Sequence, residues 1–198
     1  MSVVFKLFDA ILQAFAPILP ERVIAPSFSA VSAVALSQRR DATQHLYRES
    51  LGGRYGAGAD YDGADGVAIT LTNTANTPVE FIERAHPYLM VEEYALRRES
   101  GGAGQRRGGM GIEKRYRVLG DDVLFAAYSD RHRAGPRGLA GGGAGSRCQF
   151  LLERDGDVTE LPSKVIEPLR KGDRIRILTA GGGAYGPPLP EPEGENLA

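Results

Sequence analysis

The sequence is poor in the residues that build redox, zinc and imidazole chemistry. Its 198 residues include one cysteine, Cys148, three histidines and no tryptophan. A single cysteine excludes an internal disulfide and a structural zinc site made of several thiolates. His45 and His86 lack the local pattern of aspartate, glutamate or histidine that metal ligands follow. We therefore expect no metal site in this chain, and we expect Cys148 to be a small buried core residue.

The chain also lacks a surplus of either charge and any long hydrophobic run. Lysine and arginine number 24 against 25 for aspartate and glutamate, which gives a net charge of −1. This balance provides no long-range attraction toward nucleic acid or an anionic membrane. Lys6, Asp9 and Pro17 interrupt the apolar N-terminal stretch, which has neither a signal-peptide pattern nor the about 20 apolar residues of a membrane span. We expect a cytoplasmic protein with no nucleic-acid or membrane partner.

Apolar residues near the N-terminus recur three or four positions apart, as on one face of a helix. They are Val4, Phe8, Ile11, Leu12 and Phe15. The spacing predicts an amphipathic helix over residues 2–16, ended by Pro17 and Pro20. Its apolar face packs either on its own domain or on a part outside it, such as an N-terminal segment or a partner subunit.

Farther along, glycine blocks alternate with short segments rich in β-branched, aromatic and leucine residues. These segments predict strands over residues 67–73, 88–96, 112–119, 123–128, 148–153 and 174–178. Residues 158–161 form a further strand, joined to 148–153 by a turn in which Asp155-Gly156 predicts a hairpin. We expect an α+β fold, predominantly β, with an antiparallel sheet or barrel-like body, glycine-rich loops and an N-terminal amphipathic helix.

Composition divides the chain into parts. Residues 1–40 are expected to form an N-terminal helical segment and residues 41–187 a β-rich domain. Residues 188–198 are rich in proline and acidic at their end, and we expect this tail to be disordered. The glycine runs within 101–111 and 181–186 are expected to form tight turns with open backbone amides.

The polar run TNTANTPVE, residues 72–80, is the first candidate site. Its side chains are able to hydrogen-bond a polar ligand, or to stabilise a turn before the next element. The candidate substrate-binding residues here are Thr72, Asn73, Thr74, Asn76 and Thr77.

Two further loops carry charged candidates. In SGGAGQRRGGMG, Arg106 and Arg107 could hold an anion together with backbone amides, or form a hairpin turn that faces solvent or a partner. This loop lacks the Gly-Lys-Ser/Thr of a P-loop. Asp130 and Arg131 begin another loop, in which His132 is either a proton-transfer residue or a surface residue.

Short motifs follow one another in order along nearly the whole chain. They include Tyr47 with Glu49, Gly52-Gly53, Thr72-Asn73-Thr74, Ser100 to Gly104, Asp130-Arg131, Gly138 to Gly142 and Gly181 to Gly183. In this order and combination they resemble the hydantoinase B/oxoprolinase family. Arg54 departs from the pattern, because the family usually has a glycine there. Members are typically longer, and the resemblance covers their C-terminal part, without the N-terminal histidine and aspartate motifs assigned to the metal.

The resemblance implies a role in a larger complex. The family's A-type subunit binds ATP, and its B-type subunit handles a cyclic amide such as 5-oxoproline or a hydantoin. ATP and a divalent metal are thus implied for the complete complex, with no cofactor bound by this chain. The implied partners are an A-type subunit and an N-terminal B-type segment, and the chain alone is expected to be inactive. The alternative is a non-catalytic assembly module, or a remnant of an acetone-carboxylase-like complex.

Overall fold

The computed structural model describes residues 2–40, 42–68 and 75–188. This part of the chain contains two α-helices, a short 3-10 helix at Pro20–Arg22 and nine strands. The α-helices are α1 (Ser2–Phe15) and α2 (Val79–Ala85). The strands are β1 (Ser32–Arg40), β2 (Thr43–Leu51), β3 (Leu89–Arg97), β4 (Gly111–Val118), β5 (Val123–Tyr128), β6 (Gln149–Arg154), β7 (Asp157–Leu161), β8 (Lys164–Leu169) and β9 (Arg174–Leu178).

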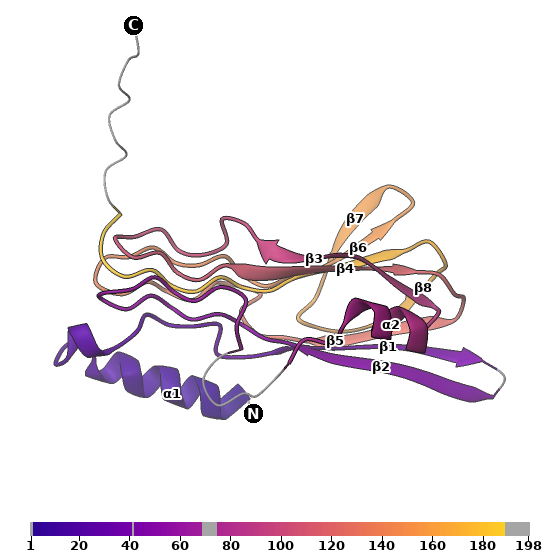
Figure 1. Cartoon of the computed structure of the whole chain (residues 1–198), viewed down its shortest axis with the longest axis horizontal. Coiled ribbons are helices and arrows are strands. Elements are labelled where there is room, and N and C mark those ends of the chain that lie inside the picture. The colour runs from indigo at the N-terminus through magenta and orange to yellow at the C-terminus, as the bar shows by residue number, and fades with distance from the viewer. Residues whose placement is uncertain (1, 41, 69–74, 189–198) are drawn as a thin grey trace, which may run out of the picture.

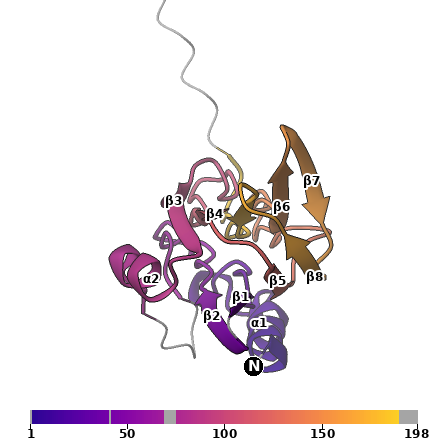
Figure 2. The same cartoon turned by 90° about the vertical axis from the view of Figure 1, so that its right-hand side faces the viewer.

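The strands form two antiparallel sheets that pack face to face. The four-stranded sheet has the order β2-β1-β5-β8, and the five-stranded sheet has the order β3-β4-β9-β6-β7. Figure 1 shows one sheet above the other, and Figure 2 shows α2 beside β3 and α1 beneath the four-stranded sheet. Side chains from both sheets fill the core; Phe125 and Phe150, for example, meet edge to face with ring centroids 6.1 Å apart. The structure confirms the expected predominantly β fold with antiparallel strands and an N-terminal helix. The described strands form two open sheets.

Short segments rich in β-branched, aromatic and leucine residues between the glycine blocks located six of the strands. The predicted segments agree within one residue at either end with β3, β4, β5, β6, β7 and β9. The hairpin between β6 and β7 turns at Asp155 and Gly156, whose φ angles are 54° and 90°. Positive φ at both central residues is what a two-residue hairpin turn requires, and Asp-Gly supports it. The other predicted strand, 67–73, lies mostly outside the described residues.

β1, β2, β8 and α2 were not predicted. β1 lies within residues 1–40, which we expected to be helical, yet it pairs with both β2 and β5. Residues 32–40 therefore belong to the four-stranded sheet, while the division of the chain at residue 40 stays a prediction. The predicted tail lies outside the described residues from residue 189 onward. Within the described ranges, no helix has the length and apolar character needed to cross a bilayer.

The glycine-rich segments run beside one another as extended backbone. They extend away from the ends of the sheets in Figure 1 and comprise residues 53–58, 100–109, 135–146 and 179–186. Their amides donate to carbonyl groups of neighbouring segments. Gly102 donates to Gly182 at 2.9 Å, Gly182 to Gly109 at 2.9 Å, and Gly109 to Tyr55 at 3.1 Å. Backbone packs on backbone here, with few side chains between.

Close approach explains why these positions are glycine. A Cβ at Gly108 would lie 2.0 Å from the carbonyl oxygen of Gly182, and a Cβ at Gly182 would lie 2.2 Å from the carbonyl oxygen of Tyr55. Neither residue is among the glycines with positive φ. At Gly108 and Gly182 the expected tight turn is therefore not the reason for glycine, whereas Gly186 has a positive φ of 72°. The glycines are needed because a side chain would separate packed backbones.

Candidate functional site

A buried ion pair joins the two sheets. On β4, Ile112, Lys114, Tyr116 and Val118 alternate inward and are all buried. Lys114 therefore projects into the core, where its Nζ lies 2.6 Å from Oε1 of Glu49 on β2. The side chains of Lys114 and Glu49 are 0% and 7% exposed. Charges buried this completely need a partner, and each supplies the other.

Three tyrosines surround the pair. The Tyr116 hydroxyl donates a hydrogen bond to Oε2 of Glu49, and the hydroxyl oxygens of Tyr47 and Tyr116 are 3.4 Å apart. Tyr94, the cross-strand neighbour of Lys114 on β3, places its ring centroid 4.3 Å from Nζ. A desolvated ammonium at this distance is attracted to the ring face. We call these five residues, Glu49, Lys114, Tyr116, Tyr47 and Tyr94, the ion-pair cluster.

Burial shifts the proton affinities in the cluster. Desolvation lowers the pKa of Lys114, and the nearby Glu49 carboxylate partly opposes this. Burial raises the pKa of Tyr116 well above its ordinary value, and the charge of Glu49 raises it further. Tyr116 thus stays a neutral donor at physiological pH, whereas Lys114 releases its proton more readily than an exposed lysine. Shifted proton affinities in a buried cluster of this kind mark it as a candidate functional site.

The cluster forms one wall of a pocket of about 230 Å³. Glu49 and Tyr94 line this pocket together with Asn76, Gly66 and Ala68 among others. The Tyr94 hydroxyl donates to Oδ1 of Asn76 at 2.6 Å, which leaves the Asn76 amide nitrogen as a donor. The pocket therefore presents a carboxylate acceptor, an amide donor and a hydroxyl. It suits a small polar molecule better than a drug-sized one.

Only some of the candidate residues in TNTANTPVE belong to the described part of the chain, which resumes at residue 75. Thr72, Asn73 and Thr74 lie outside the described residues. Asn76 reaches the pocket, and Thr77 is half-buried just before Pro78, the residue that precedes α2. Of the described candidates, Asn76 has the contact expected of a binding residue.

Arg106 and Arg107 lie at the glycine-rich end of the molecule. The guanidinium of Arg107 forms a bidentate pair with Asp65, with distances of 2.7 and 2.8 Å. The Asp65 hydrogen bonds raise the pKa of Arg107 and lower that of Asp65. Arg106 is exposed, and its amide donates to the carbonyl of Tyr185. The amides of Gly102, Gly108 and Gly109 already donate to backbone carbonyls, while anion binding by this loop stays a prediction.

Asp130 and Arg131 hold helix α1. Asp130 accepts a salt bridge from Lys6 at 3.0 Å, and the Arg131 guanidinium lies 3.4 Å from Oδ2 of Asp9. Arg131 adopts a φ of 65°, a conformation that is uncommon for residues with a side chain. The structure thus places the charged candidates at α1 and at the glycine-rich end, and they are not among the residues that line the pocket with Asn76.

Arg54, which departs from the family pattern, is a second buried cation. Its side chain is fully buried and donates to the carbonyl oxygen of Thr179 at 3.4 Å and to the Thr179 hydroxyl. The guanidinium carbon lies 5.9 Å from the ring centroid of Phe28. Burial lowers the pKa of Arg54 to about 9. The guanidinium occupies interior space that a glycine would leave open.

Sequence reasoning missed Lys114 and Tyr116. The signal was present, because Ile112, Lys114, Tyr116 and Val118 sit at every second position of a predicted strand. A lysine on the inward face of such a strand needs a buried acid, and Glu49 supplies it from a strand that was not predicted.

The described residues do not fit a divalent metal. No group of three or more histidine, cysteine, aspartate or glutamate side chains comes together within the described ranges. Cys148 is buried in the core, as its place in the sequence predicted, and desolvation there raises the pKa of its thiol. His132 packs against Phe150 with ring centroids 4.7 Å apart, and burial lowers its pKa.

Comparison with known proteins identifies a matching family and several similar proteins. The family described as Hydantoinase B/oxoprolinase matches residues 1–188. The chain is 34% identical over 200 residues to the 5-oxoprolinase PfmaA of Pestalotiopsis fici, a match that covers 96% of this chain and 15% of that protein. It is 33% identical over 190 residues to a protein of Pseudomonas sp. (strain NS671) that is named as the B-type subunit of a D-/L-hydantoinase, covering 93% of this chain and 31% of that protein.

A solved structure shares the fold. The ATP-dependent caprolactamase of Pseudomonas jessenii superposes with a TM-score of 0.74 at 23% identity, over 91% of this chain and 33% of that chain. The chain therefore spans about a third or less of these similar proteins.

Proposed function

The chain belongs to the hydantoinase B/oxoprolinase family, and we propose on this basis that it is the C-terminal part of a B-type subunit in ATP-dependent hydrolysis of a cyclic amide. Relatives named as a 5-oxoprolinase and as the B-type subunit of a hydantoinase support 5-oxoproline or a hydantoin as the substrate class. In this proposal an A-type subunit supplies ATP-binding, an N-terminal B-type segment supplies the divalent metal, and the complex works in the cytoplasm.

The observation that carries the proposal for this chain is the pocket beside the ion-pair cluster. A cyclic amide has one carbonyl acceptor and one N–H donor. The Asn76 amide nitrogen, which the Tyr94 hydroxyl orients through Oδ1, is matched to the carbonyl, and the Glu49 carboxylate is matched to the N–H. Lys114 neutralises Glu49 and keeps it in place. The pocket of about 230 Å³ has room for a five-membered ring with its substituent.

Reconstitution tests this function. The purified chain is assayed with ATP, a divalent metal and 5-oxoproline, with and without an A-type subunit and an N-terminal B-type segment. We expect glutamate and phosphate release only when all parts are present. Turnover by the chain alone, or none by the complete mixture, would show the proposal to be wrong.

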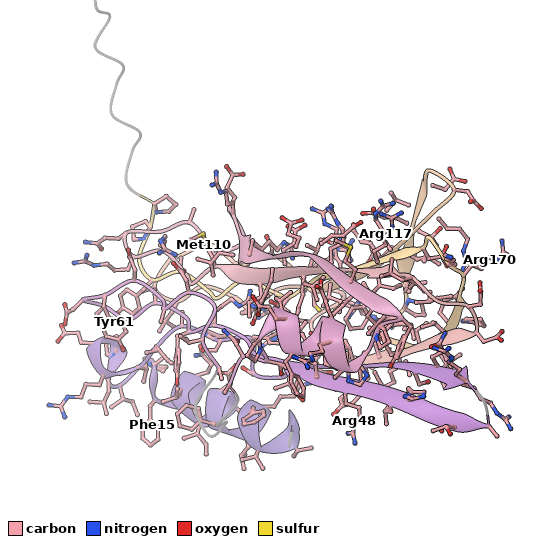
Figure 3. All side chains as sticks on the ribbon, turned by 45° about the vertical axis from the view of Figure 1, so that its right-hand side comes forward. Phe15, Arg48, Tyr61, Met110, Arg117 and Arg170 are labelled. Atoms are coloured by element: carbon pink, nitrogen blue, oxygen red, sulfur yellow. The ribbon has the colours of Figure 1, made fainter. Side chains whose placement is uncertain are left out.

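Substitutions in the pocket test whether this chain supplies residues that bind the substrate. Tyr94→Phe and Asn76→Ala should each lower kcat/KM by about 10- to 100-fold in the reconstituted complex, because each removes a hydrogen bond to the substrate or to its binding group. Tyr61→Phe, at an exposed tyrosine that does not line the pocket, is the matched control; Figure 3 shows Tyr61 at the glycine-rich end of the molecule. An active complex that is indifferent to both pocket substitutions would instead favour the non-catalytic assembly module.

A further inference from the structure

Helix α1 carries apolar side chains on two faces. Toward the body of the protein it presents the buried Phe5, the half-buried Phe8 and Leu12, and a buried carboxylate, Asp9, which accepts from Ser29 and pairs with Arg131. Toward solvent it presents an apolar stripe. The stripe consists of Val4, Leu7, Ile11 and Phe15, which are 53%, 59%, 47% and 48% exposed.

The sequence pattern predicted one apolar face, and the structure divides its residues between the body and solvent. Of the five residues, Val4, Ile11 and Phe15 are exposed, whereas Phe8 and Leu12 are half-buried. Single exposed apolar residues are common, but a stripe at i, i+3, i+7 and i+11 is a contiguous surface. Between the two packing alternatives for this helix, the geometry therefore favours a part outside the described chain.

A groove lies on the same side of the molecule as the stripe. It lies on the outer face of the four-stranded sheet and has a volume of about 950 Å³. Small residues form its floor and larger ones its sides; among them are Ala33, Ala35, Ala126, Tyr128, Ile166 and Arg48. Figure 3 shows Phe15 of α1 and Arg48 of the groove projecting from the same side of the molecule. Ile166 is 70% exposed, so this side of the sheet is uncovered in the described chain.

We propose that the stripe and the groove together are the docking face for the remainder of a hydantoinase-B-type subunit. This inference rests on the proposed function. In the similar proteins the matched region is about a third or less of the chain, so at least about two thirds of the polypeptide lies outside it. That remainder is therefore present in equal amount and at high effective concentration beside the matched region. An apolar face of this extent needs such a constant partner, because it is costly to leave in water.

A binding experiment tests the docking face. This chain is co-expressed with a polypeptide made of the part of the Pseudomonas relative outside its match, and the complex is measured by size-exclusion chromatography with light scattering and by calorimetric titration. We expect a one-to-one complex. Leu7→Glu combined with Ile11→Glu should weaken it by about 100-fold or more, since each change places a charge where an aliphatic side chain would be buried.

The matched control is Met90→Glu combined with Val158→Glu, two exposed apolar residues on the five-stranded sheet. Control and wild type should bind equally, and all three proteins should melt at the same temperature. Equal binding by the stripe variant, no binding by the wild type, or a homodimer that the stripe substitutions dissolve would overturn the proposal. Turnover in the reconstituted assay is read separately. If the stripe variant binds like the wild type but the mixture still turns over substrate, the docking proposal is wrong and the proposed function stands. If the complex forms as expected but the mixture shows no turnover, the docking proposal stands and the proposed function is wrong.

Discussion

Single charged residues in this protein join segments that are distant in sequence. Asp65 is one example, because its carboxylate accepts two hydrogen bonds from the Arg107 guanidinium and one from the amide of Met110 at 2.6 Å. It thereby fixes the loop before residue 68 against the glycine-rich loop that precedes β4. Arg107, a candidate for binding an anion, has this carboxylate as its partner inside its own chain.

Replacing Asp65 should make stability depend less on pH. The Arg107 hydrogen bonds lower the pKa of Asp65 in the folded state, so its contribution is complete above the ordinary pKa near 3.8 and is lost as pH falls through the lower folded value. We expect Asp65→Asn to cost about 1–2 kcal/mol at pH 7. Urea denaturation at pH 7, 5 and 3 measures this, with the exposed Asp60→Asn as control. The difference from wild type should shrink at pH 3; a constant difference would argue against the charge as its cause.

At the scale of elements, the molecule combines a side-chain-filled sandwich with a glycine-rich body of packed backbone. Composition predicted strands that are rich in β-branched, aromatic and leucine residues, such as β4 and β9. It missed β2, whose residues from Thr43 to Leu46 are all exposed, and β8, which has Pro168 at the sheet edge. We predicted that the glycines form turns. This prediction is correct at Gly156 and wrong at Gly182. Sequence alone does not distinguish these uses, because close backbone approach depends on segments more than 70 residues apart, such as Gly182 and Gly109.

Adding one methyl group should separate the packed backbones. A Cβ at Gly182 would lie 2.2 Å from a carbonyl oxygen, so the segments must move apart and their hydrogen bonds must lengthen. We expect Gly182→Ala to cost about 3 kcal/mol or more, at the upper end of overpacking effects. Gly52→Ala is the control, since its nearest neighbour would be at 3.1 Å, where a shift of a few tenths of an ångström suffices. Thermal denaturation of both variants decides; equal melting temperatures would contradict backbone packing as the reason for glycine.

At the scale of the whole molecule, the helices and strands differ in how firmly they are attached to the core. β4 and β9 lie inside the five-stranded sheet, each between two hydrogen-bonded neighbours. Helix α1 touches the body along one face and depends on Phe5, Asp9 and the salt bridge of Lys6 with Asp130. It has no acidic residue in its first turn and no basic residue in its last turn, so it lacks the charges that stabilise helix ends. The part proposed to bind a partner is therefore the part held least firmly.

Hydrogen exchange should reveal this difference directly. In the chain alone, amides of α1 should exchange about 100-fold or more faster than those of β4 and β9, because α1 opens without disturbing the sheets. Mass spectrometry of peptides covering residues 5–15 and 111–118 measures both regions in one experiment. Asp9→Asn should accelerate exchange in α1 only, because it removes the charge that faces Arg131 while leaving the strands unchanged. Exposed Asp60→Asn should alter neither region. If α1 is as protected as β4, the helix is an integral part of this fold, and its apolar stripe does not await a partner to become ordered.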